Sequence, residues 1–288
     1  MKPAPFDYHR VDTVEDALER LGELGDDAKV LAGGQSLVPM MNFRIVRPPA
    51  LVDITRVPDL KYVARDDGTL RIGALALHRE IEHADDDLLG GFGVLKAAAP
   101  LVGHFPIRAR GTFGGSVAHG DPASEWCMLT MLLDGEIVAR GPDGERVIPA
   151  ADFFLGFFTT ALEPGEIVRE VIVPVDGAGT GTSYQKVLQP ASGFAIVGIA
   201  VRVRKQGDKV AMARIGVTGL ANRAFRATAA EKALEGRAGT PAEIQAVAAL
   251  VGQGIDANSD LHASADYRLH LAAVYAAKAL AVALGRIA

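Results

Sequence analysis

Two short glycine pairs, each followed closely by serine, have the residue types and spacing that best fit a chemical role. They are Ala32-Gly33-Gly34-Gln35-Ser36 and Thr112-Phe113-Gly114-Gly115-Ser116. Because glycine lacks Cβ, its backbone can adopt positive φ and approach a ligand closely. Successive N–H groups in such a turn form a concave nest for phosphate, and the two serines add hydroxyl donors. Two such segments predict a ligand with two phosphates held from both sides; the competing interpretation is a pair of tight turns.

The patterns of most catalytic or metal sites do not occur in this chain. Neither glycine segment contains Gly-Lys-Ser or Gly-Lys-Thr, and no G-x-G-x-x-G follows a predicted strand. There is no H-E-x-x-H, no Cys/His cluster and no G-x-S-x-G. The single cysteine, Cys127, lies in an apolar run and is expected to be buried; one thiolate cannot hold an iron–sulfur cluster. We therefore predict no catalytic residue and no metal ligand, and any redox carrier must be a bound organic cofactor or a partner subunit.

Six further side chains near the second glycine segment or after it are candidates for the site or the core. Asp121, before Pro122, can start a helix or accept hydrogen bonds from ribose hydroxyls. His119 is interpreted as a structural residue or a hydrogen-bond donor. A dense group of phenylalanines is expected to belong to the core rather than to a stacking platform: Phe153, Phe154, Phe157 and Phe158.

The elements that must position the first glycine segment can be predicted from periodicity and caps. A helix opens at Thr13, with apolar residues at helical spacing, and ends near Gly25. A short strand over 29–31 runs directly into the glycine pair, and 50–54 is a second strand. A hairpin is predicted for 60–74, with its turn at 66–68. Helices over 78–84 and 93–102 precede the second segment, which is interpreted as a loop, and a helix over 122–133 follows it.

The later part of the chain has a different character. A hairpin over 135–148 and a strand over 167–173 are followed by the glycine-rich run 176–182, the best candidate for a linker. Two long strand-like runs, 195–203 and 210–218, then precede three helices, which start near Thr228, at Thr240-Pro241 and near Ala265. This pattern predicts a small antiparallel sheet packed on helices.

Length and composition narrow the class of protein. With 288 residues, two or three domains are expected, and 49% hydrophobic residues suit a full core. The net charge is −5 and no long basic block occurs, so no nucleic acid is expected as a partner. No uninterrupted apolar run reaches the roughly 18 residues of a membrane span, and the N-terminus lacks the apolar core of a signal peptide. A cytoplasmic protein is expected.

The two glycine runs, in their surroundings, resemble a known family. Leu31-Ala32-Gly33-Gly34-Gln35-Ser36-Leu37-Val38-Pro39 and Gly111-Thr112-Phe113-Gly114-Gly115-Ser116, followed by Gly120-Asp121-Pro122, look like the flavin-binding medium subunit of molybdenum hydroxylases. This is the group of carbon monoxide dehydrogenase and xanthine dehydrogenase. The resemblance covers nearly the whole chain and includes Leu51-Val52-Asp53-Ile54, Glu163-Pro164-Gly165-Glu166 and Ser183-Tyr184-Gln185-Lys186.

The resemblance implies an α+β fold that binds FAD in the manner of the vanillyl-alcohol-oxidase (PCMH) type. Its parts would be an N-terminal FAD-binding subdomain over 1–57, a second FAD-binding subdomain over 58–176, and a C-terminal domain of antiparallel sheet and helical bundle over 177–288. Carried over to matching positions, it implies FAD contacts from Leu31, Ala32, Gly33, Gly34, Gln35, Ser36, Leu37, Thr112, Phe113, Gly114, Gly115, Ser116, Ala118, Asp121, Val168, Lys186 and Phe194. Phe194 would pack beside the isoalloxazine ring, with plain core packing as the alternative, and Asp121 would reach the ribose or adenine side.

Two departures from the family pattern affect the cofactor. Some relatives place His where Gln35 stands, and certain enzymes of the wider fold attach flavin through a His in this region. Gln cannot form that bond, so we expect non-covalent FAD. Residues 189–193 read Gln-Pro-Ala-Ser-Gly, where relatives commonly have Arg and Asp, so charge-based tuning of the flavin from this loop is in doubt.

The function implied by the resemblance is electron transfer. FAD in this chain would accept electrons from [2Fe-2S] clusters of a small partner subunit and pass them to an external acceptor. The molybdenum cofactor would lie in a large partner subunit, and the assembly would be a dimer of heterotrimers. The alternatives are a self-sufficient flavin dehydrogenase or oxidase, a non-enzymatic FAD-binding assembly protein, and a structural protein whose glycines only make turns.

Overall fold

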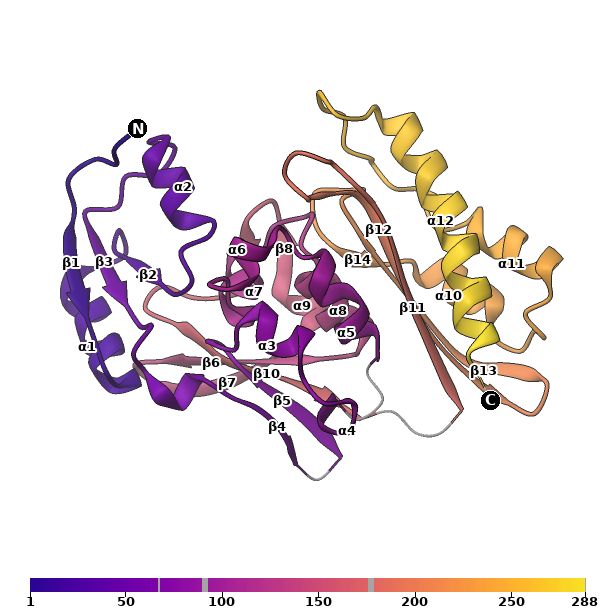
Figure 1. The fold of residues 1–288 in the computed structure, drawn as a ribbon, viewed down its shortest axis with the longest axis horizontal. Helices are drawn as coiled ribbons and strands as arrows, with labels where there is room; N and C mark the ends of the chain where they lie inside the picture. Colours follow the sequence, from indigo (N-terminus) through magenta and orange to yellow (C-terminus); the bar gives the residue numbers. More distant parts are fainter. Residues whose placement is uncertain (67, 90–92, 176–178, 288) are drawn as a thin grey trace.

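The N-terminal part of the chain is a small parallel sheet with one helix packed on it (Figure 1). The computed structural model describes residues 1–66, 68–89, 93–175 and 179–287. Thr13 accepts a hydrogen bond from the Asp16 N–H at the start of the first helix, and Gly25, with φ of 76°, ends it, as predicted. The elements are β1 (Asp7–Arg10), α1 (Val14–Leu24), β2 (Lys29–Leu31), α2 (Leu37–Asn42) and β3 (Ala50–Asp53), with the sheet in the order β1-β3-β2.

The central part is built on a five-stranded antiparallel sheet in the order β4-β5-β10-β6-β7. Its strands are β4 (Val63–Asp66), β5 (Thr69–Gly73), β6 (Glu136–Gly141), β7 (Gly144–Pro149) and β10 (Ile167–Pro174); β8 (Phe154–Gly156) and β9 (Thr159–Thr160) form a separate pair. The turn predicted at 66–68 includes residue 67, which lies outside the described residues. The helices are α3 (His78–Glu82), α4 (Asp86–Leu89), α5 (Gly93–Ala98), α6 (Phe105–Arg108), α7 (Phe113–His119), α8 (Glu125–Leu132) and α9 (Ala150–Phe153), with short 3-10 turns at Pro58–Leu60 and Ala99–Leu101.

The second glycine segment is helical, which corrects its interpretation as a loop. Thr112 caps α7 by accepting a hydrogen bond from the Gly115 N–H, and Gly120 ends the helix with φ of 64°. The next helix also differs from the prediction: α8 begins at Glu125 with Ser124 as its cap, not at Pro122. The Asp121 carboxylate instead accepts from the Ala123 N–H in the turn that precedes that cap.

The C-terminal part is a four-stranded antiparallel sheet covered on one face by three helices (Figure 1). The elements are β11 (Thr180–Leu188), β12 (Ala195–Gln206), β13 (Lys209–Thr218), β14 (Phe225–Arg226), α10 (Thr228–Leu234), α11 (Pro241–Ala248) and α12 (Ala265–Gly285). Thr240 and Glu243 form the predicted capping box. The run 176–182 is only partly a linker, since Thr180–Thr182 belong to β11; residues 176–178 lie outside the described residues.

Three hydrophobic clusters hold these parts, and two of them cross the expected boundaries at 57 and 177. Leu60, Leu75 and Ile167 complete the N-terminal cluster. Tyr184 and Ala200 from the C-terminal sheet pack into the central cluster around Trp126. The third cluster lies between that sheet and its helices.

Among the described residues, α12 is long and apolar enough to cross a membrane by length and composition alone. Its buried face, which includes Leu271, Ala276 and Leu280, packs in the core of the C-terminal part, as in the core helix of a folded domain. Of the four phenylalanines expected in the core, Phe153 and Phe154 are buried, but Phe157 and Phe158 are more than half exposed, in the turn between β8 and β9.

Candidate functional site

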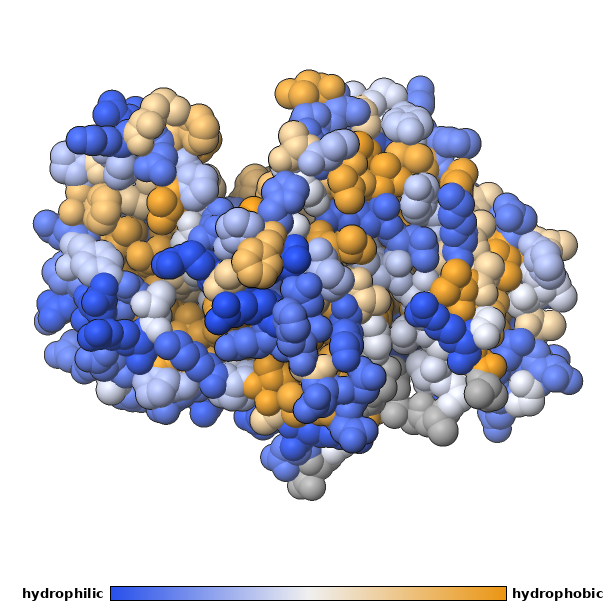
Figure 2. All heavy atoms as spheres, in the orientation of Figure 1, coloured by the Kyte–Doolittle hydropathy of each residue, from blue (hydrophilic) through white to orange (hydrophobic). Residues whose placement is uncertain are grey.

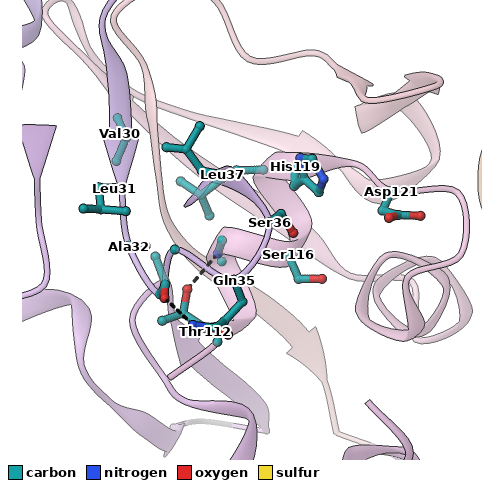
Figure 3. A pocket seen from close by; sticks show the side chains of 18 of the residues that line it. Val30, Leu31, Ala32, Gln35, Ser36, Leu37, Thr112, Ser116, His119 and Asp121 are labelled. Carbon is teal, nitrogen blue, oxygen red and sulfur yellow. Dashed lines mark hydrogen bonds between the residues drawn. The ribbon is translucent and has the colours of Figure 1, made fainter. Parts of the chain in front are cut away.

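A cavity of about 620 Å³ lies where the N-terminal and central parts meet, and residues 192–194 of the C-terminal part also line it. In the space-filling view a notch separates the N-terminal part, with α2 at its tip, from the rest of the molecule (Figure 2). The volume is in the range of sites for small molecules and cofactors. In Figure 3, Gln35 and Ser36 of the first glycine segment and Thr112 and Ser116 of the second line this hollow.

The first glycine segment provides the free backbone donors of the cavity. It follows β2 directly, and Gly34 takes a φ of 71°, a conformation that glycine adopts without strain. Within the described chain, the N–H groups from Gly33 to Leu37 make no hydrogen bond. Buried or half-buried N–H groups are normally paired, so five consecutive unpaired donors in a segment that lines the cavity are available to a ligand, and the anion nest stays a prediction.

Four of the five N–H groups of the second glycine segment, those of residues 113–116, are paired within the described chain and only that of Thr112 is not, which corrects the expected mechanism. The Phe113 N–H donates to the Ala76 carbonyl at 2.8 Å and the Gly114 N–H to the Ala74 carbonyl at 3.0 Å. The Gly115 N–H donates to Thr112 Oγ1 at 3.1 Å. The helix therefore approaches the cavity with its first donors already paired. The Ser116 hydroxyl, paired with that of Ser124 at 2.8 Å, remains at the surface of the cavity.

The glycines are needed because the two segments touch. A Cβ on Gly33 would lie 2.3 Å from the Arg110 carbonyl oxygen, closer than such atoms can approach. A Cβ on Gly114 would lie 2.5 Å from the Ala74 Cα, so this residue lets α7 press against the segment after β5. A Cβ on Gly115 would collide with its own cap, Thr112 Oγ1, at 2.6 Å. One glycine pair thus exposes donors, and the other mainly permits close packing.

A buried ion pair lies at one side of the cavity. The Lys186 ammonium contacts the Glu125 carboxylate at 2.5 Å and donates to the carbonyls of Leu101 at 2.8 Å and Gly193 at 2.6 Å. The Tyr184 hydroxyl donates to the same carboxylate at 3.1 Å. Burial raises the pKa of Glu125, and the ammonium acts in the opposite direction. Glu125 lines the cavity, whereas the Lys186 side chain, 1% exposed, does not.

The loop that carries Phe194 is tightly organised by Gln189. Gln189 Oε1 accepts from the Ser192 hydroxyl at 2.7 Å, and its backbone N–H donates to the Phe194 carbonyl. Phe194 lines the cavity with 52% of its surface exposed, so the alternative of plain core packing does not hold. Gln189 therefore has a structural role in shaping this loop.

Two titratable groups, His119 and Asp121, lie on another side of the cavity (Figure 3). Burial lowers the pKa of His119 and raises that of Asp121, while the attraction between the two opposes both shifts. The His119 ring also packs on Phe158, with ring centroids 4.9 Å apart. These two side chains can exchange hydrogen bonds with a polar ligand directly, and no metal ion is needed between them and the ligand. Among the described residues, no cluster of His, Cys, Asp or Glu could hold one.

Most of the predicted site residues do line this cavity: Leu31, Ala32, Gly33, Gly34, Gln35, Ser36, Leu37, Thr112, Gly114, Gly115, Ser116, Ala118, Asp121, Val168 and Phe194. Phe113 and Lys186 do not. Phe113 is buried with its ring centroid 4.9 Å from that of Trp126, and Lys186 is held behind the wall by its ion pair.

Sequence reasoning missed much of the remaining wall. The segment 162–167 before β10 lines the cavity, as do Val102, Gly103, Ile107 and the buried side chain of His78. Glu163-Pro164-Gly165-Glu166 was noted only as part of the family resemblance and was not assigned to the site, and the other residues belong to no motif because tertiary packing brings them there. Lys29 is the one lysine or arginine in the described lining, against five acidic residues. An anionic ligand here must therefore be held mostly by neutral donors.

Comparison with known proteins identifies the family of the chain. Residues 4–176 match the family model "FAD binding domain in molybdopterin dehydrogenase", and 182–283 match "CO dehydrogenase flavoprotein C-terminal domain". The carbon monoxide dehydrogenase medium chain of Hydrogenophaga pseudoflava is 36% identical, with 100% of both chains covered. Subunit alpha of the 6-hydroxypseudooxynicotine dehydrogenase complex of Paenarthrobacter nicotinovorans is 40% identical, covering 99% of this chain and 97% of its own.

A solved structure extends the likeness to the whole fold. The carbon monoxide dehydrogenase from Hydrogenophaga pseudoflava that lacks the Mo-pyranopterin moiety of its cofactor superposes with a TM-score of 0.97 at 39% identity, with 100% of both chains covered. The fold, the glycine-lined cavity and the full-length relatives agree on one assignment. The chain belongs to the family of FAD-binding medium subunits of molybdenum hydroxylases.

Proposed function

We propose that this chain is the electron-transfer subunit of a heterotrimeric molybdenum hydroxylase, with non-covalent FAD in the cavity between β2 and α7. The observation that carries the proposal is the row of unpaired N–H groups from Gly33 to Leu37, at the edge of a cavity of about 620 Å³. Bound FAD would supply the ability to accept and release electrons, which no side chain of the described site offers.

The residues of the cavity suggest how FAD would be held. The N–H groups of residues 33–37 and the hydroxyls of Ser36 and Ser116 would bind the diphosphate. Phe194 would pack beside the isoalloxazine ring and exclude water from it, and Asp121 would accept hydrogen bonds from the ribose. Gln35 donates to the Gly33 carbonyl at 3.1 Å and so stabilises the turn. Because Gln35 cannot bond covalently to flavin, the cofactor would stay exchangeable.

The electron path requires partner subunits. Cys127, the single cysteine, is buried and its pKa is raised by burial to about 12, so it is neither a cluster ligand nor a reactive thiol. Relatives of similar identity are named as medium chains or subunits of dehydrogenase complexes. We infer that [2Fe-2S] clusters of a small partner deliver the electrons, that a large partner holds the molybdenum cofactor, and that the complex is a cytoplasmic dimer of heterotrimers.

The substrate of the complex is expected to be selected elsewhere. Two relatives with 36% and 40% identity to this chain are named for carbon monoxide and for 6-hydroxypseudooxynicotine, two unlike molecules. Relatives of similar identity therefore belong to complexes named for unlike molecules, which supports substrate selection outside this subunit.

The proposal is tested by purifying the chain with its complex and recording the visible spectrum during addition of candidate substrates. Bound flavin that bleaches only when the partners are present supports it. Turnover by the isolated chain would favour the self-sufficient dehydrogenase, and flavin that partner-delivered electrons cannot reduce would favour the assembly protein.

The site itself is tested by Gly33→Ala, whose added Cβ would collide with the Arg110 carbonyl and displace the nest. Gly22→Ala, in α1 with nothing within 4 Å of the added Cβ, is the matched control. The control should retain FAD and the test variant should lose it. Full retention in Gly33→Ala contradicts the proposed site.

A further inference from the structure

One buried side chain in the cavity wall has a donor that the fold does not use. His78, the first residue of α3, is 4% exposed and lines the cavity. The Trp126 indole N–H donates to its Nδ1 at 2.9 Å. Because Nδ1 accepts this bond, the proton of the neutral ring resides on Nε2.

The Nε2–H group has no hydrogen-bond partner among the described residues. Nε2 is not one of the described side-chain atoms that are both fully enclosed and unpartnered. This nitrogen therefore keeps some exposed surface, which we place at the cavity that His78 lines. A polar atom in so buried a residue is normally paired with protein or a ligand. Its direction is fixed, because the indole holds the ring from one side and Gly111 packs against the other, where a Cβ would lie 2.6 Å from Nε2.

The ring is also held neutral. Burial, with a smaller contribution from the Arg108 charge, lowers the pKa of His78 to about 3. Over the physiological range His78 therefore offers one oriented donor and no charge. The glycine segment 33–34 lies directly beyond Gly111, since a Cβ on Gly33 would be 2.8 Å from the Gly111 Cα. His78 thus stands next to the row of N–H groups in a wall that contains almost no cations.

We propose that His78 is a cofactor-binding residue whose Nε2–H donates a hydrogen bond to an acceptor atom of bound FAD next to Gly111. This inference rests on the proposed function. His78 complements the nest of residues 33–37 from the opposite side of Gly111, and Trp126 acts as the positioning residue that selects the tautomer. The site holds FAD with a neutral imidazole where other proteins use arginine or lysine for phosphate.

The test uses a matched pair of variants in the purified full chain, stripped of flavin and titrated with FAD. His78→Asn keeps an acceptor near the Nδ1 position for Trp126 and removes the donor at Nε2. His78→Gln keeps an amide at the reach of Nε2 and loses the acceptor for Trp126. We expect the dissociation constant for FAD to rise about tenfold in His78→Asn, and to change much less in His78→Gln.

Each outcome separates this inference from the proposed function. Unchanged FAD affinity in His78→Asn, or an equal loss in both variants, would overturn the role of the Nε2 donor. If the wild-type chain does not bind FAD at all, the proposed function fails instead. Should both variants misfold, ¹⁵N NMR of the wild-type imidazoles decides: the His78 Nε2–H proton should shift and exchange more slowly on adding FAD, and no response refutes the contact.

Discussion

Replacing Lys186 by methionine tests the buried ion pair at the side of the cavity. Methionine fills most of the same space but removes the ammonium. The Glu125 carboxylate then loses its counter-charge, and the carbonyls of Leu101 and Gly193 lose their donor. Breaking a buried pair by removing one partner costs about 3–5 kcal/mol of unfolding free energy, because the remaining charge is buried without compensation. For a chain of this size that corresponds to a melting temperature lower by roughly 10 °C.

Two further variants make the assignment specific. Lys96→Met makes the same substitution in the exposed pair of Lys96 with Asp86, where at most about 1 kcal/mol is expected. Adding Glu125→Gln to Lys186→Met removes the uncompensated charge, so the double variant should recover part of the loss. Both are read from thermal melting followed by circular dichroism. If Lys186→Met melts within about 2 °C of the wild type, or if the double variant is the less stable of the two, the reasoning is wrong.

Three other predictions follow from the site. Thr112→Val removes the acceptor for the Gly115 N–H and should cost about 1 kcal/mol, measured by urea unfolding; an unchanged midpoint contradicts the cap. His78 titrates near 6.5 when unfolded and at about 3 when folded, so the unfolded chain binds more protons between these values and stability falls as pH falls. His78→Asn should therefore lose about 2 kcal/mol less than the wild type between pH 7.5 and 5, and equal losses refute this. Cys127 should resist iodoacetamide in the native chain, checked by mass spectrometry, and rapid labelling would show that it is accessible.

Local chemistry made several parts of this fold predictable from the sequence. The cap at Thr13, the strand 29–31 and the capping box at Thr240 depend on residues close in the chain, and all are found. The position of the cavity was also predictable, because only a glycine pair tolerates both the backbone angle of Gly34 and the contact at Gly33. The three-part division with boundaries at 57 and 177 stays a prediction.

What failed depended on partners distant in the sequence. The N–H groups at the start of α7 are taken by the Ala74 and Ala76 carbonyls, nearly forty residues away, so a segment that reads as an open nest is paired. The first residues of β11, Thr180–Thr182, were predicted as part of a linker, because their strand conformation depends on pairing with β12, more than twenty residues away. Phe157 and Phe158 belong to an apolar cluster in the sequence and were expected in the core. They lie instead in the turn between β8 and β9, which leaves them exposed.

The unequal pairing of the two glycine segments has a consequence for how a cofactor would be inserted. The α7 side of the cavity has its backbone bonds complete and gains little order from a ligand. The N–H groups from Gly33 to Leu37 would gain hydrogen bonds only when a cofactor binds. Most of the ordering of the chain and most of the gain in hydrogen-bond energy on cofactor binding would therefore occur in this stretch. In terms of maturation, α7 would already have its final conformation before the cofactor binds, and residues 33–37 would become fully ordered only when it binds.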